Sequence, residues 1–365
     1  MMTMSSKERV LKAVAHETTD RIPVDYSIRM DVSNKLIKYL GLENIEQLYQ
    51  KLGIDIRKIT IGEHHPRFDK AANGILKGQS ENSGGKYIFH DDGTYENAWG
   101  IIQKPSSDGL YDEWIRGPFS NTMDLDSFNW PDMNVFDSVE TIKKKVDNYQ
   151  GKYALRGLLN YPFKLCWQMR GLENFLCDML IEPEFAKEFL LKIASYETEK
   201  GIRMIRAGVD IVSLIGDIAM QDRLMVNVNA WREIDKPIFA DMIAKFKKEK
   251  KDVLVFYHSD GNIEEVIPDL IEIGVDIINP VQPECMDVVK IKEKYGDKIT
   301  LHGSISIQKT LPYGSVEDVR REVADRIELC GKDGGLILAP SNLIQNDTSF
   351  ENILEIYKEV GSFVV

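Results

Sequence analysis

The feature of this sequence that most constrains its fold is a unit that recurs from residue 152 onward. Each unit is a short apolar run, followed by one or two polar residues and then by a stretch with helical periodicity. The runs cover residues 152–159, 210–217, 252–260, 275–282, 299–305 and 335–342. They are apolar at consecutive positions, as strands buried on both faces of a parallel sheet must be. The repeat therefore predicts a parallel sheet whose strands are joined by helices.

The stretches between the runs carry the signals of amphipathic helices. Apolar residues recur at spacings of three and four over 184–207, and Gly208 follows the last of them. A second helix is predicted over 315–330, with Ser315 as its N-cap and Gly331 after its last turn. Helices of this kind cover the faces of a parallel sheet.

Two further runs, 21–27 and 54–61, bring the number of strand candidates to eight. Eight alternations with right-handed crossovers predict an α/β fold, a single (β/α)8 TIM barrel over residues 1–365. Residues 62–135 break the rhythm, and "KYIFHDDGTYENAWGIIQKP" predicts a β-hairpin with Asp-Asp-Gly at its turn. We interpret 62–135 as an insertion after the second strand.

Composition excludes several classes of function. The formal net charge of −12, without a compensating basic run, disfavours nucleic acid and anionic membranes as partners. The sequence lacks a signal-peptide pattern at its start and any apolar run near the ~20 residues that span a bilayer. Its four cysteines show no CxxC spacing. These features predict a cytoplasmic protein without disulfide bonds.

Polar residues end the predicted strands, and the carboxyl ends of barrel strands form the active site of such folds. They are Asp217, His258 with Asp260, Gln282, His302 with Ser304, and Ser341 with Asn342. In "VLVFYHSDG" (253–261), His258 and Asp260 stand two positions apart, so both side chains point to the same side of the strand. The pair suits a metal ion or acid/base chemistry. The alternative is that Asp260 caps a helix near Asn262 while His258 packs in the core.

The other strand ends are open to two readings each. Asp217 and His302 are candidate catalytic groups, with a solvated loop and core packing as the respective alternatives. Gln282 offers a donor and an acceptor and therefore suits substrate orientation. The adjacent His64 and His65 point in opposite directions if they lie in a strand, so at most one of them faces the site.

Five segments of the sequence resemble the uroporphyrinogen decarboxylase superfamily, in the same order and over nearly the whole chain. They are "SSKERVLKAVAHETTDRIPVDYS", "WQMRGLENFLCDMLIEPEFAKEFLLKI", "GDIAMQDRLMVNVNAWREIDKP", "HSDGNIEEVIPDLIEIGVDIINPVQPE" and "GGLILAPSNLIQNDTSFENILEIY". Within the superfamily they are most similar to the corrinoid-dependent methyltransferases, such as methylcobamide:coenzyme M and O-demethylase methyltransferases. The fold that this resemblance implies is again a single (β/α)8 barrel.

The resemblance argues against porphyrinogen decarboxylation. The true decarboxylases carry Arg-Gln-Ala-Gly-Arg after the first strand, whereas "DYSIRMDVSN" holds only Arg29 there. A tetrapyrrole with eight carboxylates needs several cations at fixed positions. Decarboxylation of a smaller acid, with its carboxylate bound by Arg29, stays open as the alternative enzyme.

The methyltransferase branch binds zinc through His-x-Cys after the fifth strand and a further Cys after the eighth. The corresponding residues here are His258-Ser259-Asp260 and Ser341-Asn342, so only His258 matches. The resemblance therefore implies one of two sites. Zinc is held by His258 and Asp260 with Asp217 or His302, or else the metal is lost and His258 acts as an acid or hydrogen-bond donor.

The resemblance implies a methyltransferase that moves a methyl group from a small methoxylated (aryl methyl ether) or methylated donor to the Co(I) corrinoid of a partner protein. The expected catalytic residues are His258, Asp217 and His302, and the expected substrate-binding residues are Gln282, Ser341, Asn342, Arg29 and Tyr26. Tyr95 and Trp99 either line the donor pocket or form the small core of the insertion. A barrel that binds a corrinoid without turnover is the non-enzymatic alternative, and a homodimer is the commonest closed assembly.

Overall fold

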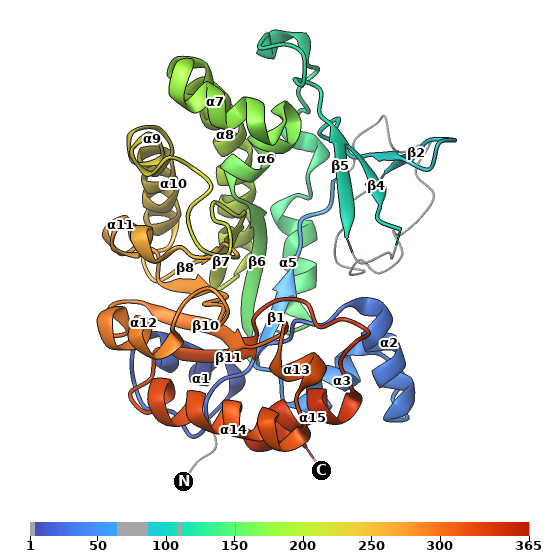
Figure 1. Ribbon diagram of the computed structural model, residues 1–365, viewed down its shortest axis with the longest axis vertical. Helices are drawn as coiled ribbons and strands as arrows, with labels where there is room; N and C mark the ends of the chain where they lie inside the picture. The colour runs from blue at the N-terminus through green and yellow to red at the C-terminus, as the bar shows by residue number, and fades with distance from the viewer. Residues whose placement is uncertain (1–3, 64–86, 108–110, 150, 365) are drawn as a thin grey trace.

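The computed structural model describes residues 4–63, 87–107, 111–149 and 151–364, and its centre is a curled parallel sheet (Figure 1). The sheet has seven strands in the order β1-β6-β7-β8-β9-β10-β11. Their bounds are β1 Ile56–Ile59, β6 Ala154–Asn160, β7 Ile211–Ile215, β8 Leu254–His258, β9 Ile277–Asn279, β10 Thr300–Ile305 and β11 Leu336–Pro340. Every neighbouring pair is parallel. The predicted α/β class and parallel sheet are confirmed.

The first predicted strand, 21–27, is not a regular strand. The Asp25 amide donates to the Leu338 carbonyl of β11 at 3.0 Å, and the Asp55 amide, just before β1, donates to the Val24 carbonyl at 3.0 Å. The segment thus bonds to both edges of the sheet, at the place of an eighth strand. Pro23 has no amide hydrogen to donate to a ladder, which limits regular pairing there. In the described part of the chain the parallel sheet has seven regular strands, and a complete eightfold barrel stays a prediction.

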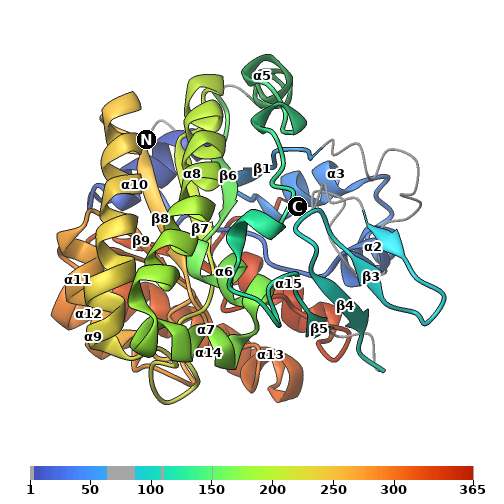
Figure 2. The same ribbon diagram turned by 90° about the horizontal axis from the view of Figure 1, so that it is seen from above.

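Helices surround the sheet on its outer side, and Figure 2 shows α8 and α10 side by side. Their bounds are α1 Ser6–Val14, α2 Met30–Tyr39, α3 Ile45–Leu52, α5 Val139–Asp147, α6 Pro162–Arg170, α7 Leu172–Ile181, α8 Pro183–Ala207, α9 Val228–Ala230, α10 Lys236–Glu249, α11 Ile267–Glu272, α12 Val288–Tyr295, α13 Thr310–Tyr313, α14 Val316–Arg326 and α15 Phe350–Glu359. None of the described helices is long and apolar enough to cross a membrane.

Two helices show how local signals set their bounds. Helix α8 has Pro183 in its first turn and ends at Gly208, whose φ of 107° closes the helix, so the predicted helix 184–207 is confirmed. Helix α14 begins at the predicted N-cap Ser315, which forms a capping box with Asp318. Its α-helical part ends at Arg326, and a π-helical turn over Ile327–Gly331 continues the helix to the predicted end.

The residues between β1 and α5 form a second, antiparallel sheet beside the parallel one (Figure 1). Its strands are β2 Ile88–Phe89, β3 Tyr95–Glu96, β4 Ile102–Pro105 and β5 Asp112–Arg116. The predicted hairpin is confirmed, since the His90 amide donates to the Thr94 carbonyl at 2.9 Å across the Asp-Asp-Gly turn. The prediction missed that the hairpin is half of a four-stranded sheet. His64 and His65 lie outside the described residues.

Tyr95 and Trp99 pack within this part of the molecule. The Tyr95 ring lies 5.1 Å from that of Tyr87, and the Trp99 ring lies 5.4 Å from that of Tyr196 on α8. Both side chains are buried. The structure therefore supports the alternative that they form the packing of the insertion and its contact with α8.

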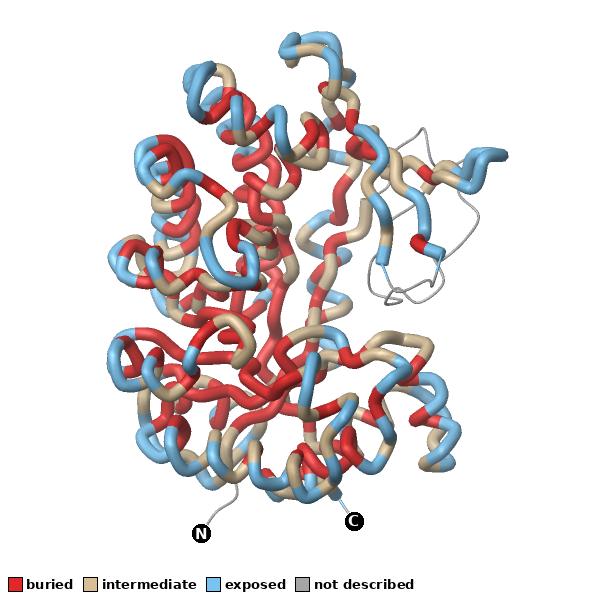
Figure 3. The backbone as a smooth tube through the Cα atoms, in the orientation of Figure 1, coloured by how far each residue is buried: buried red, intermediate tan, exposed pale blue. Residues whose placement is uncertain are grey.

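The inside of the parallel sheet has an apolar floor. Ile56, Ala154, Ile211, Phe256, Ile277 and Ile337, one from each of six strands, form a buried cluster with Val10 and Val14 of α1. Figure 3 shows how thoroughly these strands are buried. Because alternate residues of a strand share a face, the residues two positions further along each strand line the same interior above the floor. This is how the fold places the candidate site.

Candidate active site

Asp217, His258 and Asp260 come together where β7 and β8 end. His258 Nε2 lies 3.6 Å from Asp217 Oδ1 and 3.9 Å from Asp260 Oδ1. The ligand atoms of the three side chains all lie within 4.8 Å of one another. Ile215 pairs with His258 in the ladder, which brings the two strand ends level. The predicted convergence of these side chains is therefore present in the structure.

Only one of the two carboxyl oxygens of Asp260 has a hydrogen-bond partner among the described residues. Its Oδ2 accepts from Asn342 Nδ2 at 2.5 Å, and its amide donates to Asp217 Oδ1 at 2.9 Å. Its Oδ1 is buried and has no hydrogen-bond partner among the described residues. Burial raises the pKa of the Asp260 carboxyl, His258 opposes that shift, and Asp217 adds to it. A buried carboxylate oxygen without a partner is costly, so this oxygen needs a proton or a cation.

The helix-capping alternative for Asp260 is not what the structure shows. The Glu264 amide donates to Asn262 Oδ1 at 3.1 Å, so Asn262 serves that turn. His258 is not packed away in the core either, because 19% of its side chain is exposed at the mouth.

A chain of hydrogen bonds runs from His258 across the interior of the sheet. His258 Nδ1 lies 2.5 Å from Asn279 Oδ1 on β9, and Asn279 Nδ2 lies 2.7 Å from His302 Nδ1 on β10. His302 Nε2 lies 3.0 Å from Asp25 Oδ2, which also pairs with Arg156 at 3.1 Å. We call Asn279, His302 and Asp25 the interior relay.

The charges along the interior relay determine its protons. Burial raises the pKa of Asp25, but Arg156, the hydrogen bond from His302 and Lys58 together hold it well below the usual value. Burial lowers the pKa of His302 to about 4 against the opposing effect of Asp25, so the imidazole is neutral at pH 7. A neutral imidazole carries one proton, and the carboxylate of Asp25 requires it on Nε2.

The amide of Asn279 transmits this arrangement to His258. With its proton on Nε2, His302 can only accept a hydrogen bond at Nδ1, so the NH2 group of Asn279 must face that nitrogen. The same NH2 group lies 3.3 Å from the His302 carbonyl oxygen, which is also an acceptor. Asn279 Oδ1 therefore faces His258 and accepts the proton of Nδ1. In a neutral His258 the lone pair is on Nε2, directed at the two carboxylates of the mouth. A lone pair and two carboxylates around one point favour a cation there.

Of the remaining predicted residues, Gln282 and Asn342 contact the loop that carries Asp260, and Tyr26 and Arg29 have contacts of their own elsewhere. Gln282 Oε1 accepts from the Gly261 amide at 2.9 Å and so holds the loop after β8. Ser341 is buried, and its Oγ has no partner among the described residues. Tyr26 bonds Ser33 Oγ at 2.6 Å, and Arg29 pairs with Asp31 at 3.1 Å at the start of α2. Substrate binding by these residues and by Asn342 stays a prediction.

Sequence reasoning missed Asn279, Asp25, Lys58 and Arg156. The candidate residues were the polar ones at the ends of the apolar runs, whereas these four lie inside the runs. The signal that could have found three of them is the alternation of side chains along a strand. Each lies two positions after an apolar residue of the floor and therefore on the same face of the sheet: Lys58 after Ile56, Arg156 after Ala154, and Asn279 after Ile277.

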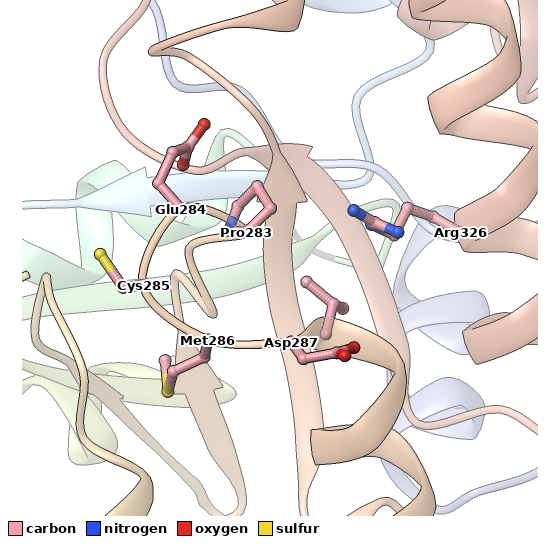
Figure 4. A pocket seen from close by; sticks show the side chains of 7 residues that line it. Pro283, Glu284, Cys285, Met286, Asp287 and Arg326 are labelled. Atoms are coloured by element: carbon pink, nitrogen blue, oxygen red, sulfur yellow. The ribbon is translucent and has the colours of Figure 1, made fainter. Parts of the chain in front are cut away.

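A separate hollow of about 420 Å³ lies beside the mouth, between the loop 283–288 and Arg326 of α14 (Figure 4). It adjoins the centre through Cys285, whose Sγ lies 3.6 Å from Gln282 Oε1. The described residues contain one cluster of three metal-ligating side chains, and it is Asp217, His258 and Asp260. We therefore take the mouth of the sheet as the candidate active site.

Comparison with known proteins agrees with this fold. Over its full length the chain resembles the structure of a methyltransferase from Methanosarcina mazei, with 17% identity, a TM-score of 0.68 and 99% of each chain covered. Uroporphyrinogen decarboxylase from Chlorobium phaeobacteroides is 23% identical over 219 residues, 58% of this chain and 60% of that protein's length. The Chlorobaculum parvum enzyme is 22% identical over 255 residues, 67% of this chain and 69% of its own length. Residues 115–363 match the family model for uroporphyrinogen decarboxylase, and the chain therefore belongs to the uroporphyrinogen decarboxylase family.

Proposed function

We propose that this chain is a methyltransferase that transfers a methyl group from a small methoxylated or methylated donor to the Co(I) corrinoid of a partner protein. The observation that carries the proposal is the convergence of His258 Nε2 with the oxygens of Asp217 and Asp260. The similarity in fold to a methyltransferase from Methanosarcina mazei is compatible with this activity. The donor would bind in the mouth, and the corrinoid protein would dock over it.

The three side chains fit a divalent metal ion, for which zinc is the first candidate. They offer one imidazole nitrogen and two carboxylate oxygens, and the orphaned Oδ1 of Asp260 points to a missing partner. When bound there, such an ion supplies a Lewis acid for a donor oxygen. The ligand set is harder than one with thiolates, so it favours an oxygen-centred donor over a thiol.

The bonds and electrons of the proposed methyl transfer balance between the donor and the corrinoid. The bond between the methyl carbon and the donor oxygen breaks, and the oxygen keeps the bonding pair. The methyl carbon bonds to cobalt, whose electron pair is used, so Co(I) becomes Co(III). The donor oxygen gains negative charge, which the cation site at His258 would offset. Without a metal, a protonated His258 would donate its Nε2 proton to that oxygen instead.

Decarboxylation of a smaller acid is the second candidate. Arg29, which the sequence suggested for the carboxylate, is paired with Asp31. Lys58 and Arg156 inside the sheet would take that role, which is the one observation that favours this candidate.

Metal binding and transfer can be tested on four proteins: the wild type, His258→Ala, Asp260→Asn, and the control Asp222→Asn, which removes an exposed acid of the segment after β7. After chelator treatment, zinc titration by calorimetry should show about one equivalent in the wild type and in the control. Loss of either ligand should weaken binding at least about tenfold.

The second measurement uses methoxybenzoates, Co(I) cobalamin and a reductant, with absorbance of methyl-Co(III) and release of CO2 as readouts. We expect methyl-Co(III) with the wild type and Asp222→Asn, and at least about a hundredfold less with His258→Ala. Unchanged transfer by His258→Ala would contradict the site. Release of CO2 without methyl-Co(III) would replace the methyltransferase with the decarboxylase.

A further inference from the structure

Two basic side chains stand next to each other inside the sheet. Lys58 of β1 and Arg156 of β6 are partners in the strand register. Each comes two positions after a floor residue, Ile56 and Ala154 respectively, so both point into the interior. Arg156 is buried, with its guanidinium 4.5 Å from the centre of the Phe256 ring, whereas Lys58 is only partly buried.

The described residues offer this pair a single carboxylate, that of Asp25. Arg156 is its ion-pair partner, at 3.1 Å, and the Tyr26 amide and His302 complete its contacts. Lys58 Nζ donates to the neutral Tyr26 carbonyl at 2.8 Å. Arg156 Nε is buried without a hydrogen-bond partner among the described residues. With neutral His302, two cations and one anion leave a local charge of +1.

Such an arrangement is costly for the folded chain alone. Two like charges that are partners on neighbouring strands repel each other, and the single carboxylate of Asp25 can balance only one of them. Burial lowers the pKa of Lys58 to about 8, with Asp25 opposing the shift and Arg156 adding to it, so the ammonium is still charged at pH 7.

The neighbouring Arg57 shows how this chain pairs a cation that serves structure alone. Arg57 points to the other side of β1, where Glu46 accepts from its Nε and Nη2 at 2.8 and 2.9 Å. Its Nη1 donates to two carbonyl oxygens. Lys58 is the next residue of the same strand, but no carboxylate among the described residues pairs with it in this way.

We propose that Lys58, with Arg156 behind it, binds the anionic group of the substrate, and that this group is a carboxylate. The inference rests on the proposed function and names its donor class: a small methoxylated carboxylate. In the order of the sheet, β1 lies three places from β8, which carries His258. The interior is thus basic on the β1 side and acidic at Asp217 and Asp260, and a donor with a carboxylate at one end and a methoxy group at the other matches both.

The experiment compares binding of 4-methoxybenzoate and 4-methoxybenzamide, which have nearly the same shape and differ in charge. Calorimetry needs neither corrinoid nor turnover, so it is independent of methyl transfer. We expect the wild type to bind the carboxylate at least about tenfold more tightly, as a charge-assisted hydrogen bond provides. The preference should shrink between pH 7 and pH 9, as Lys58 loses its proton.

Three variants make the test specific. Lys58→Met should abolish the preference, Lys58→Arg should keep it, and the control Lys144→Met, at an exposed position of α5, should behave as the wild type. Should Lys58→Met fail to fold, the pH dependence of the wild type and Lys58→Arg still decide the matter. Equal affinity for the two probes in the wild type, or no binding of either, would overturn the proposal, as would a preference that survives in Lys58→Met. A carboxylate preference without methyl transfer would retain the anion site and remove only the methyltransferase.

Discussion

The chemistry that we propose for this chain depends on one lone pair, that of His258 Nε2. A histidine has two tautomers, and the hydrogen bond at one ring nitrogen determines what the other can do. Here Asp25 sets the proton of His302, His302 sets the amide of Asn279, and Asn279 sets the proton of His258. His302, expected from the sequence as a catalytic group or ligand, has both ring nitrogens engaged in this chain of hydrogen bonds. We therefore propose that it acts through Asn279 as a positioning residue.

At this scale we predict the effect of Asn279→Leu, which keeps the size of the side chain and removes its hydrogen bonds. His258 can then adopt either tautomer, so the affinity for zinc should fall about tenfold to a hundredfold, as for other partners behind a metal ligand. Calorimetry measures the affinity, and the pH dependence of binding should shift with it. The control is Thr300→Val, since the buried Thr300 Oγ1 has no partner among the described residues. Zinc affinity unchanged by Asn279→Leu would show that the relay does not position His258.

At the scale of single elements, the ends of strands and helices decide which residues reach the site. The sequence predicted one continuous strand over 275–282, but β9 ends at Asn279. Val281 then has a φ of 46°, a left-handed conformation that is costly for a β-branched residue. This turn separates Asn279, which faces His258, from Gln282, which bonds the loop after β8. The Asn279-Pro280 pair is a local signal for a turn, because proline has no amide hydrogen to donate to the ladder, and the predicted strand 275–282 overlooked it.

Helix α14 offers a test of a local signal that the sequence did reveal. Ser315→Ala removes the side-chain acceptor of the Asp318 amide and should lower the free energy of unfolding by about 1 kcal/mol. Denaturant titration followed by circular dichroism measures it, with no change in zinc binding. Ser195→Ala, at an exposed position within α8, should be neutral or slightly stabilising because alanine favours helix. An equal loss in both variants would contradict the capping role.

At the scale of the whole molecule, distant segments create environments that no local stretch contains. Asp235, in the π-helical turn Trp231–Asp235 before α10, is buried close to Tyr161 and Tyr257. Neither of its carboxyl oxygens has a hydrogen-bond partner among the described residues. Burial raises the pKa of Asp235 to about 7, and the nearby Tyr161 opposes the shift. This carboxyl is therefore protonated at acidic pH in the folded protein.

The titration of the Asp235 carboxyl should appear in the pH dependence of the free energy of unfolding. Its folded pKa lies above the unfolded value near 3.8, so its contribution is complete below pH 4 and is lost as the pH rises to about 7. Asp235→Asn stays neutral, so its stability relative to the wild type should increase between pH 5 and pH 8, by about 3 kcal/mol at 1.36 kcal/mol per pKa unit. Unfolding temperatures at both pH values measure the change. The exposed control Asp241→Asn should show no such trend, and neither variant should show one if Asp235 titrates normally.

The sequence by itself determined the class of fold and the centre of the candidate site. Consecutive apolar runs require a parallel sheet, and parallel strands bring their carboxyl ends to one edge, so Asp217, His258 and Asp260 had to meet. Only the tertiary structure decided the irregular segment around Val24, the interior relay and the pairing of Lys58 with Arg156. These features depend on strand register and on where each strand ends, and register is a relation between segments far apart in the chain, which no single segment encodes.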